Sequence, residues 1–303
     1  MHKKMQAIDL VGHNNPVYTI VTHPKLNLCY TAGNDKGIVE WDTLSQKFLR
    51  VFNPVLHTVY ALQIVLPYNL LVAGCSNGHI LFFDIESGLL QFTLEANAAV
   101  FCIKYLPQKH EILASTDAGE MIVISINEKK IVYRFATGTQ KIRNFDFNLN
   151  LDILATASND ATVRLYLLAD YSFVHQFEAH TLGVSAIAFS PDGKKLITAS
   201  RDAHLKIWNT QNWLCLHTIT AHLFTIYQIS FHPQLPYFAT CSRDKSIKIW
   251  RSIDYSLFKN LSIDNNINGH RLSVNHIYWQ ANGKSILSVS DDKLLKIWTL
   301  NLF

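Results

Sequence analysis

The chain has 303 residues, of which 49% are hydrophobic and 17% charged, and its formal net charge is +4. This composition excludes a generally disordered chain, which would be more polar and more highly charged. It also excludes a strongly basic chain, since no block of like charges could neutralise a run of phosphates. A chain of this length can bury roughly three-quarters of its unfolded surface, so it needs no disulfide or metal to hold a core.

The first predicted element is a strand over residues 5–11. It resembles segments that end later repeats, such as 214–221, but it precedes the first Gly-His pair, Gly12-His13. We expect it to pair with the C-terminal strands within 274–300 and to cover an edge that would otherwise invite aggregation. The start of the chain has no signal-peptide pattern and no apolar window of about 18 residues occurs, so we expect a cytoplasmic chain that makes no membrane contact.

From residue 12 onward the sequence repeats. Seven segments each end in an aromatic or apolar anchor residue, and an acidic or amide residue stands six positions before each anchor. The anchors are Trp41, Phe83, Val123, Tyr166, Trp208, Trp250 and Trp298, and the residues six positions earlier are Asp35, Asn77, Asp117, Asp160, Asp202, Asp244 and Asp292. A period of about 40 to 45 residues indicates a repeat architecture.

Within one repeat the apolar residues alternate at period two. The segments 184–188, 196–200, 205–209 and 214–219 are separated by turn signals such as 190–193. This pattern predicts four short hairpin-linked strands per repeat, with no sustained helical stripe. The final interval between anchors is longer, which predicts an extended loop around 264–268 before the last repeat.

These features resemble the WD-repeat family of β-propellers. Trp41-Asp42 is the literal dipeptide, and Gly12-His13 and Gly269-His270 are the Gly-His signal. The resemblance covers essentially the whole chain. It implies an all-β fold: a seven-bladed β-propeller of four-stranded antiparallel blades, closed by strand 5–11, in a single domain over residues 1–303.

The resemblance also implies a buried, hydrogen-bonded set of four side chains in a blade. The set contains a loop His, a Ser or Thr on the second strand, a turn Asp and a Trp on the third strand. Carried over by spacing, the complete sets are His180, Ser200, Asp202 and Trp208; His222, Ser242, Asp244 and Trp250; and His270, Ser290, Asp292 and Trp298. Blade one has His13, Asp35 and Trp41, but Gly33 stands at the expected hydroxyl position.

The recurring Ser, His and Asp superficially resemble a nucleophilic triad. Because three copies occur at identical spacing, each ending at a Trp, we interpret them as structural networks and expect no catalytic residue. The 14 histidines share no ligand spacing, the five cysteines form no C-x-x-C pair, and no phosphate-binding glycine motif occurs. We therefore expect no metal, no cofactor and reduced, buried cysteines.

The resemblance further implies which face would bind a partner. In WD-repeat proteins the commonly used face presents three positions per blade, two flanking the first apolar residue of the inner strand and one just before the turn Asp. The candidate partner-binding residues at these positions are Tyr18, Tyr60, Phe101, Lys141, Arg143, Arg201, Tyr227 and Arg243. An aromatic arc in blades one to three is expected to face a basic arc in blades four to six.

Tyr and Arg dominate binding hot spots because each supplies a large contact area and directed hydrogen bonds. The leading hypothesis is a non-catalytic protein–protein interaction scaffold that holds an extended peptide segment of a partner, with acidic or phosphorylated residues against the arginines. Two alternatives stay open. One is an enzyme that uses the propeller channel, and the other is a single-stranded nucleic-acid binder through the basic arc, which the low net charge disfavours. The sequence sets no oligomeric state.

Overall fold

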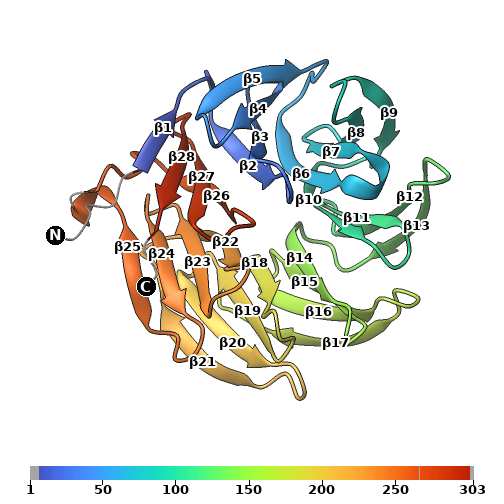
Figure 1. Ribbon diagram of the computed structural model, residues 1–303. Helices are drawn as coiled ribbons and strands as arrows, with labels where there is room; N and C mark the ends of the chain where they lie inside the picture. The colour runs from blue at the N-terminus through green and yellow to red at the C-terminus, as the bar shows by residue number, and fades with distance from the viewer. Residues whose placement is uncertain (1–6, 266, 301–303) are drawn as a thin grey trace.

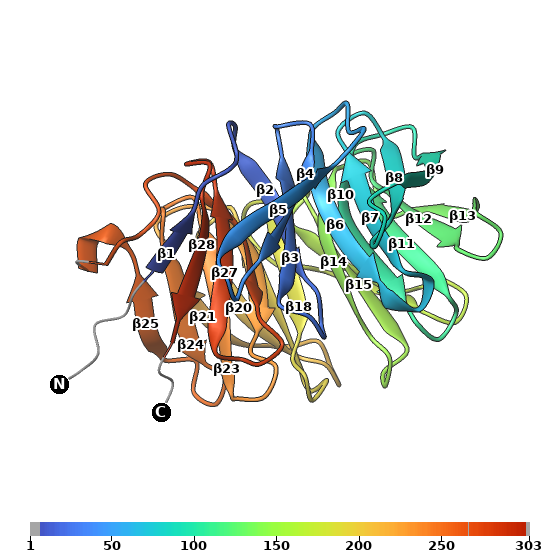
Figure 2. The same ribbon diagram turned by 45° about the horizontal axis from the view of Figure 1, so that its top comes forward.

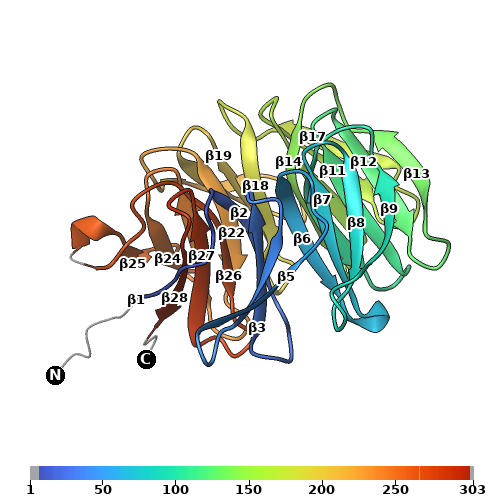
Figure 3. The same ribbon diagram turned by 90° about the horizontal axis from the view of Figure 1, so that it is seen from above.

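In the computed structural model, which describes residues 7–265 and 267–300, strands β1 to β28 form seven four-stranded antiparallel sheets. The sheets are the blades of a ring (Figure 1). The all-β, seven-bladed propeller predicted from the sequence is confirmed. Seen from the side, the strands cross the thickness of the ring from one face to the other (Figure 3).

In blades one to six the chain runs from the innermost strand outward. Blade one contains β2 (Val17–Thr22), β3 (Leu28–Gly33), β4 (Ile38–Asp42) and β5 (Lys47–Phe52). Blade two contains β6 (Val59–Val65), β7 (Leu70–Cys75), β8 (His79–Asp84) and β9 (Leu90–Glu95). Blade three contains β10 (Val100–Leu106), β11 (Glu111–Thr116), β12 (Glu120–Ser125) and β13 (Lys130–Ala136).

The second half of the ring follows the same order. Blade four contains β14 (Ile142–Asn148), β15 (Ile153–Ser158), β16 (Thr162–Leu167) and β17 (Phe173–Glu178). Blade five contains β18 (Val184–Phe189), β19 (Lys195–Ser200), β20 (His204–Asn209) and β21 (Cys215–Thr220). Blade six contains β22 (Ile226–Phe231), β23 (Tyr237–Ser242), β24 (Ile247–Arg251) and β25 (Leu257–Leu261). Two short 3-10 helices, η1 (Leu66–Tyr68) and η2 (Ile263–Asn265), lie in loops, and η2 starts the extended loop before blade seven.

Blade seven closes the ring with strands from both ends of the chain. It contains β26 (Val274–Trp279), β27 (Ser285–Ser290), β28 (Leu295–Thr299) and, as its outer strand, β1 (Ala7–Leu10). Strand β1 lies beside β28 (Figure 2). Ala7 is paired with Trp298 and Leu10 with Leu295 in this antiparallel pair. The predicted closing strand is therefore confirmed, with residues 5 and 6 outside the described part of the chain.

The core consists of apolar clusters between neighbouring blades. One cluster joins Trp41 and Val17 of blade one to Leu287 and Ile297 of blade seven. The inner and middle strands are buried on both faces, whereas the outer strands alternate or lie exposed, as in β9. Cys215 lies on such an outer strand and is exposed, so the expectation that every cysteine is buried is wrong. No helix in the two described ranges is long and apolar enough to cross a bilayer.

The hydrogen-bonded sets exist, but their hydroxyl group comes from a different residue. In blade five, Trp208 Nε1 donates to Thr198 Oγ1 at 2.9 Å, and Thr198 Oγ1 lies 2.8 Å from His180 Nε2. The Nδ1 atom of His180 lies 3.1 Å from an oxygen of Asp202. The order is therefore Trp to Thr to His to Asp, with Ser200 outside the chain of contacts.

The same correction applies to the other sets. Thr240 and Ser288 replace Ser242 and Ser290, and Thr31 completes the set of blade one. The Oγ atoms of the three serines instead bond to loop carbonyls, those of Leu182, Phe224 and Leu272. The physical reason is the strand pleat, because residues two apart share one face and only the one farther from the turn reaches the Trp indole.

Blade three departs from the predicted register by one residue. The outer-strand bulge precedes Trp208 in blade five but precedes Ile124 in blade three, so Ile124 and not Val123 is the anchor. The turn position six residues before this anchor is then Ala118. Asp117 stands one position earlier, at the site that Arg201 occupies in blade five, and it donates its backbone N–H to Ala99 as Arg201 does to Gly183.

Candidate functional site

A β-bulge opens every inner strand and sets the site geometry. In each blade the pairing of the innermost strand skips one residue near its start, as between Val17 and Thr19 in blade one and between Ile142 and Asn144 in blade four. The seven skipped residues are Tyr18, Tyr60, Phe101, Arg143, Ser185, Tyr227 and Asn275. A bulge turns a side chain away from the regular pleat. All seven line one funnel of about 430 Å³ at the mouth of the channel.

The aromatic residues of blades one to three form a continuous row. The ring centroids of Tyr18 and Tyr60 lie 5.7 Å apart, and those of Tyr60 and Phe101 lie 4.7 Å apart with the planes almost parallel. These separations are typical of attractive aromatic pairs. The rings are half-buried, so each keeps part of its surface open to the funnel.

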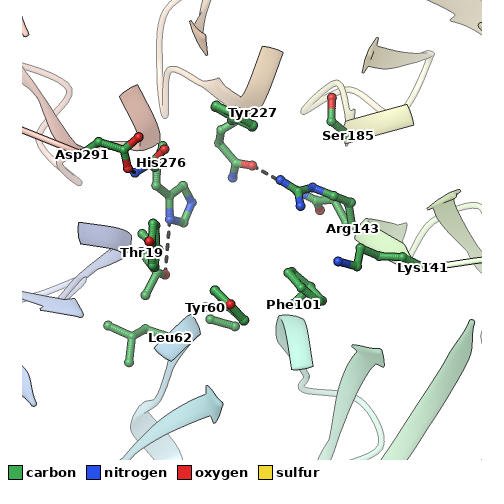
Figure 4. A pocket seen from close by; sticks show the side chains of 15 residues that line it. Thr19, Tyr60, Leu62, Phe101, Lys141, Arg143, Ser185, Tyr227, His276 and Asp291 are labelled. Carbon is green, nitrogen blue, oxygen red and sulfur yellow. Dashed lines mark hydrogen bonds between the residues drawn. The ribbon is translucent and has the colours of Figure 1, made fainter. Parts of the chain in front are cut away.

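The basic residues of blades four to six meet the end of this row. Lys141 Nζ lies 4.2 Å from the Phe101 ring centroid, and the Arg143 guanidinium lies between the rings of Phe101 and Tyr227, at 5.6 and 5.8 Å (Figure 4). Such cation–π contacts are attractive. The aromatic and basic arcs, which the sequence predicts on opposite sides of the channel mouth, therefore also join at Phe101.

Four cations share a second hollow beside the funnel. Lys141, Arg143, Arg201 and Arg243 line a cavity of about 250 Å³, together with Asn159, Thr225 and Tyr227. We call this cavity the cation hollow. Among the residues that the structure describes, no carboxylate lines it. Some partly buried cations elsewhere in the ring have an acid of their own, as Arg50 has Glu40 at 2.6 Å.

The electrostatics of the cation hollow reflect this crowding. Burial lowers the pKa of Arg143 below its ordinary value, and the charge of Arg201 lowers this pKa further. Burial also lowers the pKa of Lys141, as does the charge of Arg143, while the charge of Asp117 acts in the opposite direction. The site therefore holds positive charge at a free-energy cost that an anion would relieve.

The structure brings the eight predicted partner-binding residues together at one channel mouth. Six of them line the funnel, and Arg201 and Arg243 line the adjoining cation hollow. Sequence reasoning missed His276, which lies below the bulge of blade seven in the funnel wall. Its Nδ1 accepts a hydrogen bond from the Ile20 N–H at 3.2 Å. Burial, and to a lesser degree the charge of Lys104, lower the pKa of His276 to about 4.

Nothing in the repeat spacing marks His276, because this inner-strand position differs from blade to blade. The other missed residue, Asp117, was hidden by the register error in blade three.

The opposite mouth of the channel differs in charge and chemistry. It forms a cavity of about 420 Å³ that contains Lys104 and Asp146, and these two residues pair at 2.7 Å. Asp146 also accepts a hydrogen bond from the Phe189 N–H at 2.7 Å. The cation on this side is thus neutralised within the chain. Within residues 7–265 and 267–300, no group of three potential metal ligands occurs.

Comparison with known proteins agrees with this architecture. The family model described as "WD domain, G-beta repeat" matches residues 4–42, 171–209, 213–251 and 262–299, just over half of the chain. The chain belongs to the WD-repeat family. The matched segments are the parts of the repeat that contain the His, hydroxyl, Asp and Trp sets. Blades two to four, which the family model does not match, have no Trp anchor.

Individual WD-repeat relatives are distant. The chain is 21% identical over 208 residues to "Eukaryotic translation initiation factor 3 subunit I" of Saccharomyces cerevisiae, covering 62% of this chain and 60% of that protein. It is 31% identical over 81 residues to "COMPASS component SWD3" of the same organism, covering 26% of this chain and 25% of that protein. It is 26% identical over 172 residues to "p21-activated protein kinase-interacting protein 1-like" of Danio rerio, covering 55% and 45%. The chain thus spans less than two thirds of the length of each of these relatives.

Proposed function

We propose that this WD-repeat propeller is a non-catalytic interaction scaffold that docks an extended segment of a partner protein across the funnel and the cation hollow. The observation that carries the proposal is the junction at Phe101, where an open aromatic row meets a cavity lined by four cations and, among the described residues, by no carboxylate. Aromatic and arginine side chains at a concave, half-buried site have the character of binding hot spots. The expected cytoplasmic location belongs to the same proposal.

Two further findings support a protein partner. Two relatives, the translation initiation factor 3 subunit and the COMPASS component, are named as parts of larger assemblies. A third relative is named as a kinase-interacting protein. The fold also supports rigid docking, because the bulge residues stand on the innermost strands, each of which pairs with a middle strand and packs between the neighbouring blades. A rigid scaffold lowers the entropy lost when a flexible segment binds. Apolar groups of the segment would lie against Tyr60 and Phe101, and acidic or phosphorylated groups would lie against the arginines.

A charge-reversal comparison tests this proposal. Arg201 and Arg243 are exposed, and within the described part of the chain their side chains make no hydrogen bond or ion pair, so replacing them leaves the core unchanged. The test variant is Arg201→Glu/Arg243→Glu. The matched control is Lys194→Glu/Lys284→Glu, with the same change in net charge on exposed residues in the loops at the opposite ends of inner strands.

All three proteins are used to capture partners from native lysate after circular dichroism shows that they are folded. We expect wild type and the control variant to capture the same partner and the test variant to lose it. Equal capture by wild type and the test variant would contradict docking at this face.

A further inference from the structure

We infer that the cation hollow binds a phosphomonoester dianion on the partner segment and that apolar residues flank the phosphorylated residue on both sides. This inference rests on the proposed function and specifies its ligand.

The first step concerns charge. Lys141, Arg143, Arg201 and Arg243 line one cavity of about 250 Å³. Three other arginines of the ring have their own acid: Arg50 pairs with Glu40, Arg134 with Glu120 and Arg164 with Asp160. A single carboxylate would leave most of the charge in the cation hollow uncompensated. A phosphomonoester carries about −1.5 to −2 charges at pH 7, which matches a cluster of several cations better.

The second step concerns donors. Guanidinium groups are planar and present paired N–H donors, so they bind phosphate oxygens in bidentate fashion. Three of the four cations are arginines, and Asn159, Thr225 and Tyr227 add neutral donors to the wall. A phosphate has three terminal oxygens that need several donors at once, whereas a carboxylate has two.

Exposed apolar side chains also occur in the loops beside Arg201 and Arg243. Leu182 and Phe224 are 52% and 56% exposed at the tips of the loops that enter blades five and six. Each loop is fixed in place, because Ser200 Oγ donates to the Leu182 carbonyl at 2.9 Å and Ser242 Oγ donates to the Phe224 carbonyl at 3.2 Å. This gives the two serines a role that the hydrogen-bonded sets do not give them.

The exposed apolar tips are tied directly to the arginines. The backbone N–H of Arg201 donates to the Gly183 carbonyl at 3.1 Å, and that of Arg243 donates to the Thr225 carbonyl at 2.9 Å. Gly183 and Thr225 directly follow Leu182 and Phe224 in sequence. An apolar side chain next to the phosphorylated residue would therefore meet Leu182 or Phe224.

The border of the cation hollow at Phe101 is also apolar. Phe101 contacts both Lys141 and Arg143 and stacks on Tyr60, so a segment that leaves the cation hollow toward the channel passes over aromatic rings. The site thus has an apolar surface, a cation cluster and a second apolar surface in succession. A segment with the order apolar, phosphorylated, apolar complements it.

The test uses the full chain and an oriented peptide library. One arm of the library fixes phosphoserine, phosphothreonine or phosphotyrosine at the centre, and the second arm fixes Glu. We expect enrichment of phosphorylated peptides with apolar flanks and at least tenfold weaker binding of the matched Glu peptides. We expect Arg201→Gln/Arg243→Gln to lose this binding and Lys194→Gln/Lys284→Gln to keep it.

Several results would overturn the inference. These are equal binding of Glu and phosphorylated peptides, no enrichment of apolar residues at the flanking positions, or equal loss of binding in both variants. Competition arms with inorganic phosphate and with a single-stranded RNA identify other anion sources. Tighter binding of the RNA through the same arginines, with a steep salt dependence, would replace the phosphopeptide by nucleic acid.

Phosphatase treatment of the lysate separates this inference from the proposed function. If treatment abolishes capture of the partner by wild type, both are supported. If capture survives treatment but is still lost in Arg201→Glu/Arg243→Glu, the docking face stands and the phosphate requirement is wrong.

Discussion

The Nζ atom of Lys296 on β28 lies 2.6 Å from the Asp9 carboxylate on β1, so an ion pair joins the first and last strands of the chain. The Lys296 side chain is 1% exposed, and its other contact is the Asn268 carbonyl at 3.1 Å. The ion pair therefore lies where the closing strand meets the last blade. It stabilises the observed register of β1, in which Asp9 stands opposite Lys296, in addition to the backbone hydrogen bonds.

Removing Asp9 should destabilise the closure. Asp9→Ala leaves a buried ammonium group without its acid, and we expect a loss of about 3 kcal/mol in the free energy of unfolding, near the lower limit for a broken buried pair because Asp9 is itself partly exposed. Urea unfolding measures this loss. The control is Glu128→Ala, which breaks an exposed pair with Lys130 and should cost at most about 1 kcal/mol. A cost for Asp9→Ala no larger than that of the control would contradict this role.

The corrected hydroxyl assignment makes a clear prediction in blade six. Thr240 Oγ1 accepts a hydrogen bond from Trp250 Nε1 at 2.9 Å and lies 2.8 Å from His222 Nε2. Thr240→Val leaves both buried groups without a partner and should cost about 2 to 5 kcal/mol, whereas Ser242→Ala should cost about 1 to 2 kcal/mol. Thr240→Ser keeps the hydroxyl and serves as the control. Thermal and urea unfolding rank the three variants, and a larger cost for Ser242→Ala than for Thr240→Val would restore the original assignment.

The number of blades and the closing strand could be predicted from the sequence, because the distance along the chain between anchor residues is nearly the same in most repeats, loops included. The prediction failed where two residues satisfy the same spacing rule. Thr198 and Ser200 lie on one face of β19, and only their distances to Trp208 and His180 distinguish them. The sequence of blade one pointed to the correct hydroxyl position, because Thr31 has a hydroxyl group and Gly33, two residues later, has none.

The repeat positions predicted that the eight candidate residues lie on one face, but not how their side chains are arranged. Five of the eight residues stand at the bulge that recurs in every inner strand, and Lys141, Arg201 and Arg243 stand at two other positions of the repeat on the same face. The contact of Phe101 with Lys141 and Arg143 depends on side-chain directions across two blades, which spacing along one chain does not fix. Asp117 was misplaced because blade three lacks both the His and the Trp that would mark its register.

The free energy of unfolding of the ring should decrease as the pH is lowered, partly because of His276. Its pKa is about 4 in the folded chain, against an ordinary value of 6.5, because burial disfavours the charged ring. In the unfolded chain His276 takes up a proton below about pH 6.5, whereas in the folded chain it does so only near pH 4. The free energy of unfolding therefore decreases as the pH falls from about 6.5 to about 4. We expect about 2 kcal/mol of this loss at pH 5 to come from His276.

The variant His276→Asn isolates this contribution. An Asn side chain does not titrate and offers an oxygen to the Ile20 N–H. Urea unfolding from pH 7.5 to pH 4 should give a shallower decline for His276→Asn than for wild type, while the other titrating groups contribute equally to both. Parallel curves would contradict the prediction.

The repulsion between the neighbouring cations Lys141 and Arg143 can be measured in the absence of a partner protein. The charge of Arg143 lowers the pKa of Lys141, so Arg143→Gln should raise that pKa. A higher pKa leaves less neutral amine, and acetylation of Lys141 by acetic anhydride should slow at pH 8. Mass spectrometry follows the modification, with Lys194 in a distant loop as an internal control whose rate stays constant. An unchanged Lys141 rate would show that Arg143 does not act on it.

The central claim is that a partner segment docks on the face that holds the funnel and the cation hollow. The most direct measurement places photo-crosslinkable benzoylphenylalanine at Leu223, which is 81% exposed on this face, and separately at Lys284, in the loop after β26 on the other face. Each protein is irradiated in native lysate, and the crosslinked peptides are sequenced by mass spectrometry. We predict that position 223 crosslinks to one segment of the captured partner and that position 284 does not. Crosslinking from position 284 alone would contradict the account and move the docking site to the opposite mouth.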